Sequence, residues 1–209
     1  VNDRELQASL TTETEHSGYI IGAIDPAAGG DNSAIVIKSA HLMEVVFNQK
    51  LQNTMDLVSR VVDINREYKV DYWIVDKTGV GQGVYDRMKE MDYPIRGVSF
   101  GEKSEDPQYA NLKAEWHFKL RKWIVGGGKL KQDYGWNEIE VVKYKHKDSK
   151  IIIQPKEELF RDGISSPNVV DAAVLTMVME DNSIKSARII KQRYGREFFD
   201  QTDKIWRNE

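Results

Sequence analysis

The chain has 209 residues, of which 40% are hydrophobic, and a formal net charge of −3, enough for one domain with a sizeable core. It has no cysteine, which excludes disulfides and zinc sites built on thiolates. No apolar stretch approaches the roughly 20 residues that cross a bilayer, and the first residues lack the pattern of a signal peptide, so we expect no membrane partner.

Residues 1–17 are polar and show no periodic pattern. We expect them to form a linker, or a fragment of a preceding domain, that lies outside the core. The domain itself is predicted at 18–182. Its first elements are three apolar runs, at 19–24, 33–38 and 43–47, whose short connections favour antiparallel strands in one sheet.

Two helices and two further strands follow these runs. Asn53 or Thr54 caps a helix whose apolar residues fall on one side as far as Tyr68. A fourth strand is predicted at 70–75, a second helix around 84–91 and a short fifth strand at 95–98. The predicted order is therefore βββαβαβ.

The second half of the domain begins with a longer helix, predicted from about Asp106 to Val125. The runs at 139–145 and 150–154 indicate a β-hairpin. Ser166 as N-cap and Pro167 at the first helical position start a nearly all-apolar helix, typical of a buried one. The remainder, 183–209, is a charged tail, predicted as a docking helix or a disordered arm.

Asp25 and Asp76 end the first and fourth predicted strands. If those strands are neighbours, the two carboxylates stand side by side, and like charges at that distance repel unless a cation lies between them. Hard carboxylate oxygens without thiolates suit Mg²⁺ or Mn²⁺. For Asp25 alone, a strand-ending turn is the alternative, because Asp-Pro and Gly-Gly are common turn dipeptides. Asp31, just beyond that turn, is a further candidate ligand.

Asp171 lies inside the apolar helix, where an unpaired charge is costly. It is the third candidate ligand; the alternative is an ion pair with one of the many lysines. Asn168, three residues earlier, lies on the same helix face, where its amide oxygen suits a weak ligand or the holding of a metal-bound water.

Lysines concentrate between 113 and 150, and a local positive face of this kind can bind nucleic acid despite the negative net charge. A solvated, salt-bridged surface is the alternative. Lys156 leaves the hairpin toward the apolar helix, where it could contact a scissile phosphate; the alternative is an exposed loop lysine. The glycine-rich run at 79–83 is a strand-to-helix turn that lets backbone N–H groups approach a phosphate.

In their order, the segments AIDPAAGGDNSAIVI, IVDKTGVGQGVYDRM, NLKAEWHFKLRKWI and IIIQPKEELFRDGISSPNVVDAAVLTMVM resemble one family. It is the nuclease domain of the large terminase subunit of tailed bacteriophages, a member of the ribonuclease H-like superfamily, and the resemblance covers 19–180. It implies an α/β fold with a five-stranded mixed central sheet flanked by helices and an added β-hairpin. The first and fourth strands would be adjacent at its centre.

The resemblance also implies a metal-dependent DNA endonuclease that cuts concatemeric viral DNA during genome packaging. Asp25, Asp76 and Asp171 would match the catalytic metal-binding acids for two Mg²⁺ or Mn²⁺ ions, with Asp25 bridging both and Lys156 near the phosphate. Many family members carry an acid where this chain has Asn168. Double-stranded DNA would follow the hairpin lysines, which are Lys143, Lys145, Lys147 and Lys150.

Implied partners are the packaging ATPase domain of the same intact subunit, joined through residues 1–17, the portal and the small terminase subunit, in the host cell cytoplasm during virion assembly. Two alternatives stay open. Another ribonuclease H-like nuclease, such as a Holliday-junction resolvase or a transposase core, would prefer branched DNA or RNA–DNA hybrids. A non-catalytic DNA-binding module would bind no metal. An actin-like nucleotide-binding domain is disfavoured, because it needs a second phosphate loop and roughly twice this length.

Overall fold

The computed structural model describes residues 1–13 and 15–178, so the predicted tail at 183–209 lies outside the described residues. Its strands are β1 (Leu10–Thr11), β2 (Ile21–Asp25), β3 (Ser33–Lys38), β4 (Leu42–Gln49), β5 (Tyr72–Asp76), β6 (Ile95–Val98), β7 (Lys129–Lys131), β8 (Tyr144–Lys147) and β9 (Lys150–Ile153). Its helices are α1 (Asp3–Ser9), α2 (Thr54–Tyr68), α3 (Gly81–Glu90), α4 (Leu112–Val125), α5 (Glu138–Val141), α6 (Lys156–Arg161) and α7 (Asn168–Leu175), with 3₁₀ turns η1 (Tyr134–Asn137) and η2 (Thr176–Val178).

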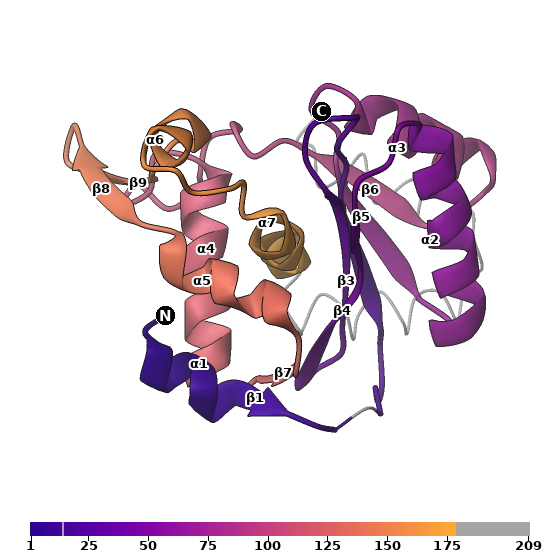
Figure 1. Cartoon of the computed structure of the whole chain (residues 1–209), viewed down its shortest axis with the longest axis horizontal. Coiled ribbons are helices and arrows are strands. Elements are labelled where there is room, and N and C mark those ends of the chain that lie inside the picture. The colour runs from indigo at the N-terminus through magenta and orange to yellow at the C-terminus, as the bar shows by residue number, and fades with distance from the viewer. Residues whose placement is uncertain (14, 179–209) are drawn as a thin grey trace. The chain divides into compact units, whose positions relative to one another are not determined.

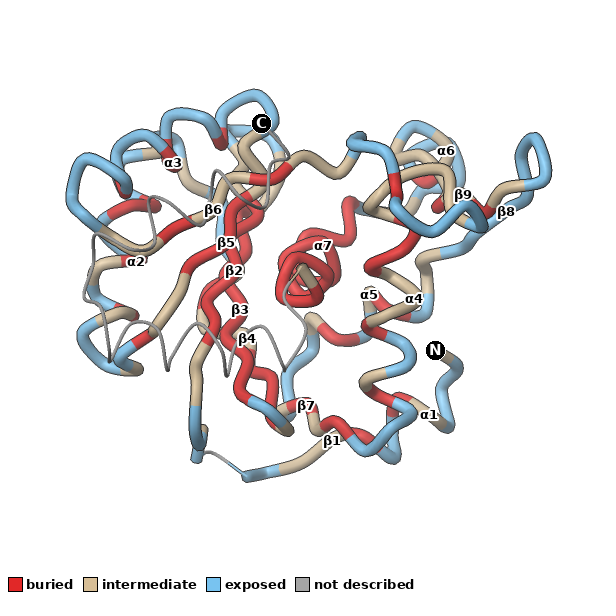
Figure 2. The backbone as a smooth tube through the Cα atoms, turned by 180° about the vertical axis from the view of Figure 1, so that it is seen from behind, coloured by how far each residue is buried: buried red, intermediate tan, exposed pale blue. Residues whose placement is uncertain are grey.

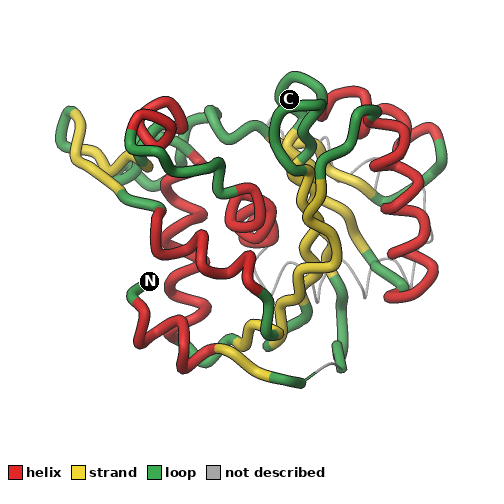
Figure 3. Tube along the Cα trace, viewed as in Figure 1, coloured by secondary structure: helices red, strands yellow, loops and turns green. Residues whose placement is uncertain are grey.

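One mixed sheet forms the centre of this part of the chain (Figure 3), in the order β1-β7-β4-β3-β2-β5-β6. The predicted meander is confirmed, since β2 pairs antiparallel with β3 and β3 with β4. Strands β5 and β6 continue the sheet in parallel beside β2. The five predicted strands are thus contiguous, and two short strands that the sequence did not predict extend the sheet to seven. The predicted hairpin is present as β8 and β9.

Helices cover both faces of the sheet (Figure 1). On one face, α2 and α3 pack on the strands through an apolar cluster that includes Ile35, Leu57, Val61, Val75 and Met88. On the other face, α7 packs against β2 and β3, and the central strands and α7 are buried (Figure 2). Strands covered on both faces are continuously apolar, which explains why β2 and β3 show no alternation. Among the described helices, none has the length and apolarity to cross a membrane.

The first residues differ from the expectation of a segment outside the core. Asn2 and Glu5 form a reciprocal capping box that starts α1, and Leu6 is only 1% exposed. Strand β1 pairs in parallel with β7, and α1 packs on α4 with an ion pair of 2.7 Å between Glu5 and Arg121. A seven-residue helix and a two-residue strand are too short to produce a readable periodicity, and the spacing of three between Asn2 and Glu5 was the available signal for the helix.

Element boundaries in the second half of the domain also differ from the prediction. Helix α4 starts at Leu112 rather than near Asp106, because Asn111 caps it through Ala114 N and the Asp106 side chain accepts from Gln108 N in a separate turn. The hairpin starts at Tyr144, because residues 138–141, which include Ile139 and Val141 of the predicted strand, form α5. Pro167 is the N-cap of α7 rather than its first residue, and the helix tightens into a 3₁₀ turn after Leu175.

Candidate metal centre

Asp25 and Asp76 lie at the same edge of the sheet. Strands β2 and β5 pair in parallel with Ile24 opposite Val75, and each aspartate is the next residue. Asp25 is 7% exposed, whereas Asp76 is half-buried and accepts a hydrogen bond from Thr78 N at 2.9 Å. The predicted adjacency of these two strand ends is confirmed.

The glycine-rich turn after β5 brings α3 close to the end of that strand. A Cβ atom built on Gly81 would lie 1.8 Å from the backbone oxygen of Asp76, a distance that no side chain can occupy. Gly79 has a φ of +59°, in the left-handed region that favours glycine. The approach of α3 to β5 therefore requires glycine here.

Asp171 projects from α7 and is 1% exposed. Lys113 of α4 places its Nζ 2.8 Å from Asp171 Oδ1 and 3.0 Å from Oδ2, and Lys156 of α6 places its Nζ 3.3 Å from Oδ2. Burial opposes the charge on this carboxyl, but Lys113, His117 and Lys156 together hold the pKa of Asp171 well below its usual range. The structure thus shows the alternative of an ion pair between Asp171 and a lysine. Lys156 is half-buried at the start of α6 and is not the exposed loop lysine of the other alternative.

The Asp25 carboxyl is in the opposite electrostatic situation. Burial raises the pKa of Asp25 to about 8, and the negative charge of Asp171 adds to the rise, while Lys156 and Lys113 oppose it. Asp76 contributes a smaller upward effect. Two buried carboxylates that interact in this way are unstable together as anions, so additional positive charge between them would be favourable.

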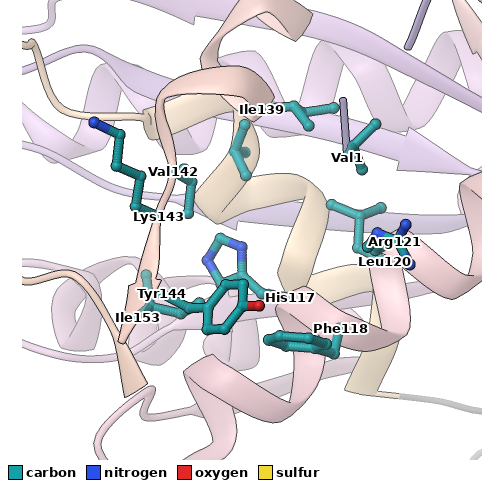
Figure 4. Close-up of a pocket in the computed structure, with 11 residues that line it drawn as sticks. Val1, His117, Phe118, Leu120, Arg121, Ile139, Val142, Lys143, Tyr144 and Ile153 are labelled. Atoms are coloured by element: carbon teal, nitrogen blue, oxygen red, sulfur yellow. The ribbon is translucent and has the colours of Figure 1, made fainter. Parts of the chain in front are cut away.

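His117, four residues after Lys113 on α4, is a site residue that sequence reasoning missed. Its Nε2 lies 3.8 Å from Asp171 Oδ1, and burial lowers the pKa of the imidazole although Asp171 acts in the opposite direction. The ring also lines a cavity of about 570 Å³ beside α4, α5 and the hairpin, together with Phe118, Ile139 and Tyr144 (Figure 4). The spacing of four between Lys113 and His117 on one helix face was the available signal.

Asn168 is the first residue of α7, 6% exposed, one helical turn before Asp171. Asp31 is half-buried and close enough to Lys156 to favour the charged form of the lysine. Burial lowers the pKa of Lys156, but Asp171, Asp25 and Asp31 raise it above its usual value.

A further residue missed by sequence reasoning is Glu138 of α5, whose Oε2 accepts hydrogen bonds from two backbone N–H groups of α7.

The hairpin lysines form a separate surface. Every residue of β8 is exposed, including Lys147; Lys143, directly before the strand, is also exposed, while Lys150 is half-buried. Lys145 forms an ion pair with Glu158 of α6. The hairpin is held at its base by Ile151, which pairs with Tyr109 and exchanges backbone hydrogen bonds with the loop before α4.

Among the described residues, no group of three or more His, Asp or Glu side chains is arranged closely enough to hold a metal ion. The donor set nevertheless fits a hard divalent cation. Asp25 and Asp171 are buried carboxylates that repel each other, and oxygen donors of this type suit Mg²⁺ and Mn²⁺. Lys113 and Lys156 supply part of the positive charge that these carboxylates require.

The sequence matches no protein-family model and no curated protein. Solved structures do match its fold. The nuclease domain of the large terminase subunit gp2 of bacterial virus Sf6 has a TM-score of 0.72 and 16% identity, over 86% of this chain and 98% of that one. The large terminase nuclease of thermophilic phage G20c, with bound magnesium, has a TM-score of 0.62 and 14% identity, over 83% and 94%.

This chain has the fold of the terminase nuclease domains. The α/β fold predicted from the sequence is therefore confirmed, with a central mixed sheet, flanking helices and a separate hairpin. A mutant of the Sf6 domain, with a TM-score of 0.71 and 16% identity to this chain, was solved with manganese. The structural match with this chain extends over nearly the whole length of each of these solved domains.

Proposed function

We propose that the chain is a metal-dependent DNA endonuclease, the nuclease domain of a large terminase subunit that cuts concatemeric viral DNA during genome packaging. One observation carries the proposal. Asp25 and Asp171, from opposite ends of the domain sequence, are both buried where α7 packs against β2, and the negative charge of Asp171 raises the pKa of Asp25. Perturbed carboxyl pairs of this kind cluster at functional sites.

Asp25, Asp76 and Asp171 would hold two Mg²⁺ or Mn²⁺ ions, with Asp31 and Asn168 as further ligands. When bound, such ions activate a water for in-line attack on the phosphodiester and stabilise the leaving oxygen. The burial of Asp25 and Asp171 keeps bulk water from screening the charges at this edge of the sheet, which strengthens their effect on a phosphate group.

Lys156 is the residue proposed to offset the negative charge of the scissile phosphate. Its pKa is raised by Asp171 and Asp25 against the effect of burial, so it stays protonated over the working pH range. With Asp171 engaged by a metal ion, the Lys156 ammonium would be released to offset the charge on the scissile phosphate.

Double-stranded DNA is the proposed substrate, and the exposed hairpin with Lys143, Lys145, Lys147 and Lys150 is its proposed contact surface. Lysine contacts to phosphates carry little sequence information and depend strongly on salt. In the intact subunit the partners would be a packaging ATPase domain, the portal and the small subunit, in the host cytoplasm during virion assembly.

Cleavage of supercoiled plasmid with Mn²⁺ tests the proposal. The unaltered chain should nick and linearise the plasmid, and Asp25→Ala and Asp171→Ala should abolish cutting. Asp86→Ala, which removes an exposed carboxylate of α3, is the matched control and should cut normally. Undiminished cutting by either site variant would refute the assignment of the centre. Branched DNA and RNA–DNA hybrids belong in the same assay, since a strong preference for either would favour a resolvase or another ribonuclease H-like enzyme.

A further inference from the structure

The first turn of α7 has no cap of its own. Pro167 at the N-cap position makes no side-chain hydrogen bond to the helix, although the first N–H groups of any helix lack partners within it. Val169 and Val170 are 0% and 1% exposed, so water is not available to their backbone. An unpaired N–H group at this depth would destabilise the turn that carries Asn168 and Asp171.

Glu138 supplies the missing partner from a distant part of the sequence. Its Oε2 accepts hydrogen bonds from Val169 N at 2.8 Å and from Val170 N at 3.2 Å. Burial raises the pKa of Glu138 to about 7, the two backbone donors lower it, and the charge of Asp171 adds to the rise. One side chain therefore holds two consecutive N–H groups directly before the buried carboxylate of the candidate centre.

Glu138 also lies at the base of the hairpin. It begins α5, which leads through residues 142–143 into β8 (Figure 1). At that base, Gln154 N donates to Lys143 O, and β9 is followed closely by Lys156 at the start of α6. The segment that anchors α7 is thus continuous with the proposed DNA-contacting surface.

We propose that Glu138 is a positioning residue of the centre: its carboxylate fixes the first turn of α7, and thereby the placement of Asp171, from the base of the hairpin. Glu138 does not itself touch substrate or metal in this proposal. It acts through the backbone of Val169 and Val170, as residues behind metal ligands do when they orient the ligands. The inference rests on the proposed nuclease function and adds a residue that the fold alone does not assign.

Three variants test this role. Glu138→Ala removes the acceptor, Glu138→Gln retains an acceptor oxygen without the charge, and Glu140→Ala is the matched control on the exposed side of the same short helix. Mn²⁺ affinity measured by calorimetry should fall about tenfold or more in Glu138→Ala, the usual range for a partner behind the ligands. Glu138→Gln and Glu140→Ala should bind Mn²⁺ like the unaltered chain.

Two further measurements separate positioning from general stability. Amide hydrogen exchange at Val169 and Val170 should accelerate in Glu138→Ala and not in Glu138→Gln. In the cleavage assay kcat should fall with little change in the KM for DNA. Where Glu138→Ala is unfolded at the assay temperature, Glu138→Asp, which shortens the side chain by one methylene, should show the same losses in a folded protein.

The outcomes distinguish the two proposals. An unaltered chain that neither binds Mn²⁺ nor cuts DNA overturns the proposed function and this inference with it. An unaltered chain that binds and cuts, while Glu138→Ala does both equally well, overturns the positioning role alone. Equal damage by Glu138→Gln and Glu138→Ala would also overturn it, because the capping oxygen would then not be the cause.

Discussion

The Nζ atom of Lys113 lies 2.8 Å from one carboxylate oxygen of Asp171 and 3.0 Å from the other. The lysine comes from α4 and the aspartate from α7, and the aspartate is almost fully buried. This contact balances a charge that the apolar helix could not otherwise accommodate. It also places a cation on the oxygens that a divalent metal would use.

Lys113→Met should therefore have two opposite effects. Without metal, the variant should lose up to about 3 kcal/mol of unfolding free energy, because a buried carboxylate loses one of its cations. With Mn²⁺, its melting temperature should rise by more than that of the unaltered chain, because the metal no longer displaces an ammonium group. Thermal unfolding with and without Mn²⁺ measures both. Lys119→Met, which breaks an ion pair with Glu115 on the same helix, is the control, and an equal metal response in all three proteins would contradict the prediction.

The raised pKa of Asp25 predicts how stability depends on pH when a chelator is present. The folded protein holds this proton up to about pH 8, whereas an unfolded aspartate loses it near pH 4. The folded state therefore binds more protons between these values, and the unfolding free energy should fall as the pH rises, by at most about 1.4 kcal/mol per pH unit. Above pH 8 this contribution should level off.

Urea unfolding of the unaltered chain and of Asp25→Asn at pH 5, 6, 7 and 8 is the measurement. The Asp25→Asn protein should show a flatter dependence and be the more stable of the two at pH 8. Glu138, with a pKa raised mainly by burial to about 7, contributes a slope of the same sign in both proteins. Identical slopes for the two proteins would mean that Asp25 titrates normally.

The structure of the hairpin predicts that its lysines contribute unequally to DNA affinity. Lys147→Ala should weaken binding and reduce the slope of log affinity against log salt by about 0.9, the value for one phosphate contact. Lys145→Ala should have a smaller effect, because Lys145 is already paired with Glu158. Fluorescence anisotropy with duplex DNA at several salt concentrations measures this, with Lys50→Ala, an exposed lysine after β4, as control. A salt slope unaffected by Lys147→Ala would remove the hairpin from the binding surface.

Substituting alanine for each of the two glycines of α3 should change the stability of the protein in opposite directions. Gly81→Ala should destabilise the protein and disturb the end of β5, because its Cβ would collide with the backbone oxygen of Asp76. Gly83→Ala should raise stability by about 0.5 kcal/mol or more, since a Cβ there meets nothing within 4 Å and alanine is favoured in helices. Chemical denaturation of both variants decides the point; equal effects would show that the turn tolerates a side chain.

The five central strands, the hairpin and the burial of Asp25 and Asp171 could be predicted because their signals are local. Asp25 and Asp76 each end an apolar run, and the order of elements brings those runs together in parallel. Asp171 stands out because it interrupts a helix that is otherwise apolar. Recognising each aspartate needs only the residues on either side of it, whereas the adjacency of the two strands was implied by the family resemblance.

The residues that sequence reasoning missed all act across elements. Lys113 and His117 reach Asp171 only because α4 packs against α7, and a lysine or histidine on a helix carries no mark of its partner. Glu138 was hidden because the apolar residues after it suggested a strand, whereas they form α5. Leu6 was missed because a helix as short as α1 shows too few turns for a pattern.

The meeting of β2 with α7 has a consequence for the order of events during synthesis. Asp25 belongs to the first long strand and Asp171 to the last described helix, so the two carboxylates cannot come together before nearly all of 18–178 has left the ribosome. Contacts this distant along the chain form late in folding. An incomplete chain therefore has no assembled centre, and any cutting activity arises only once the whole domain has folded.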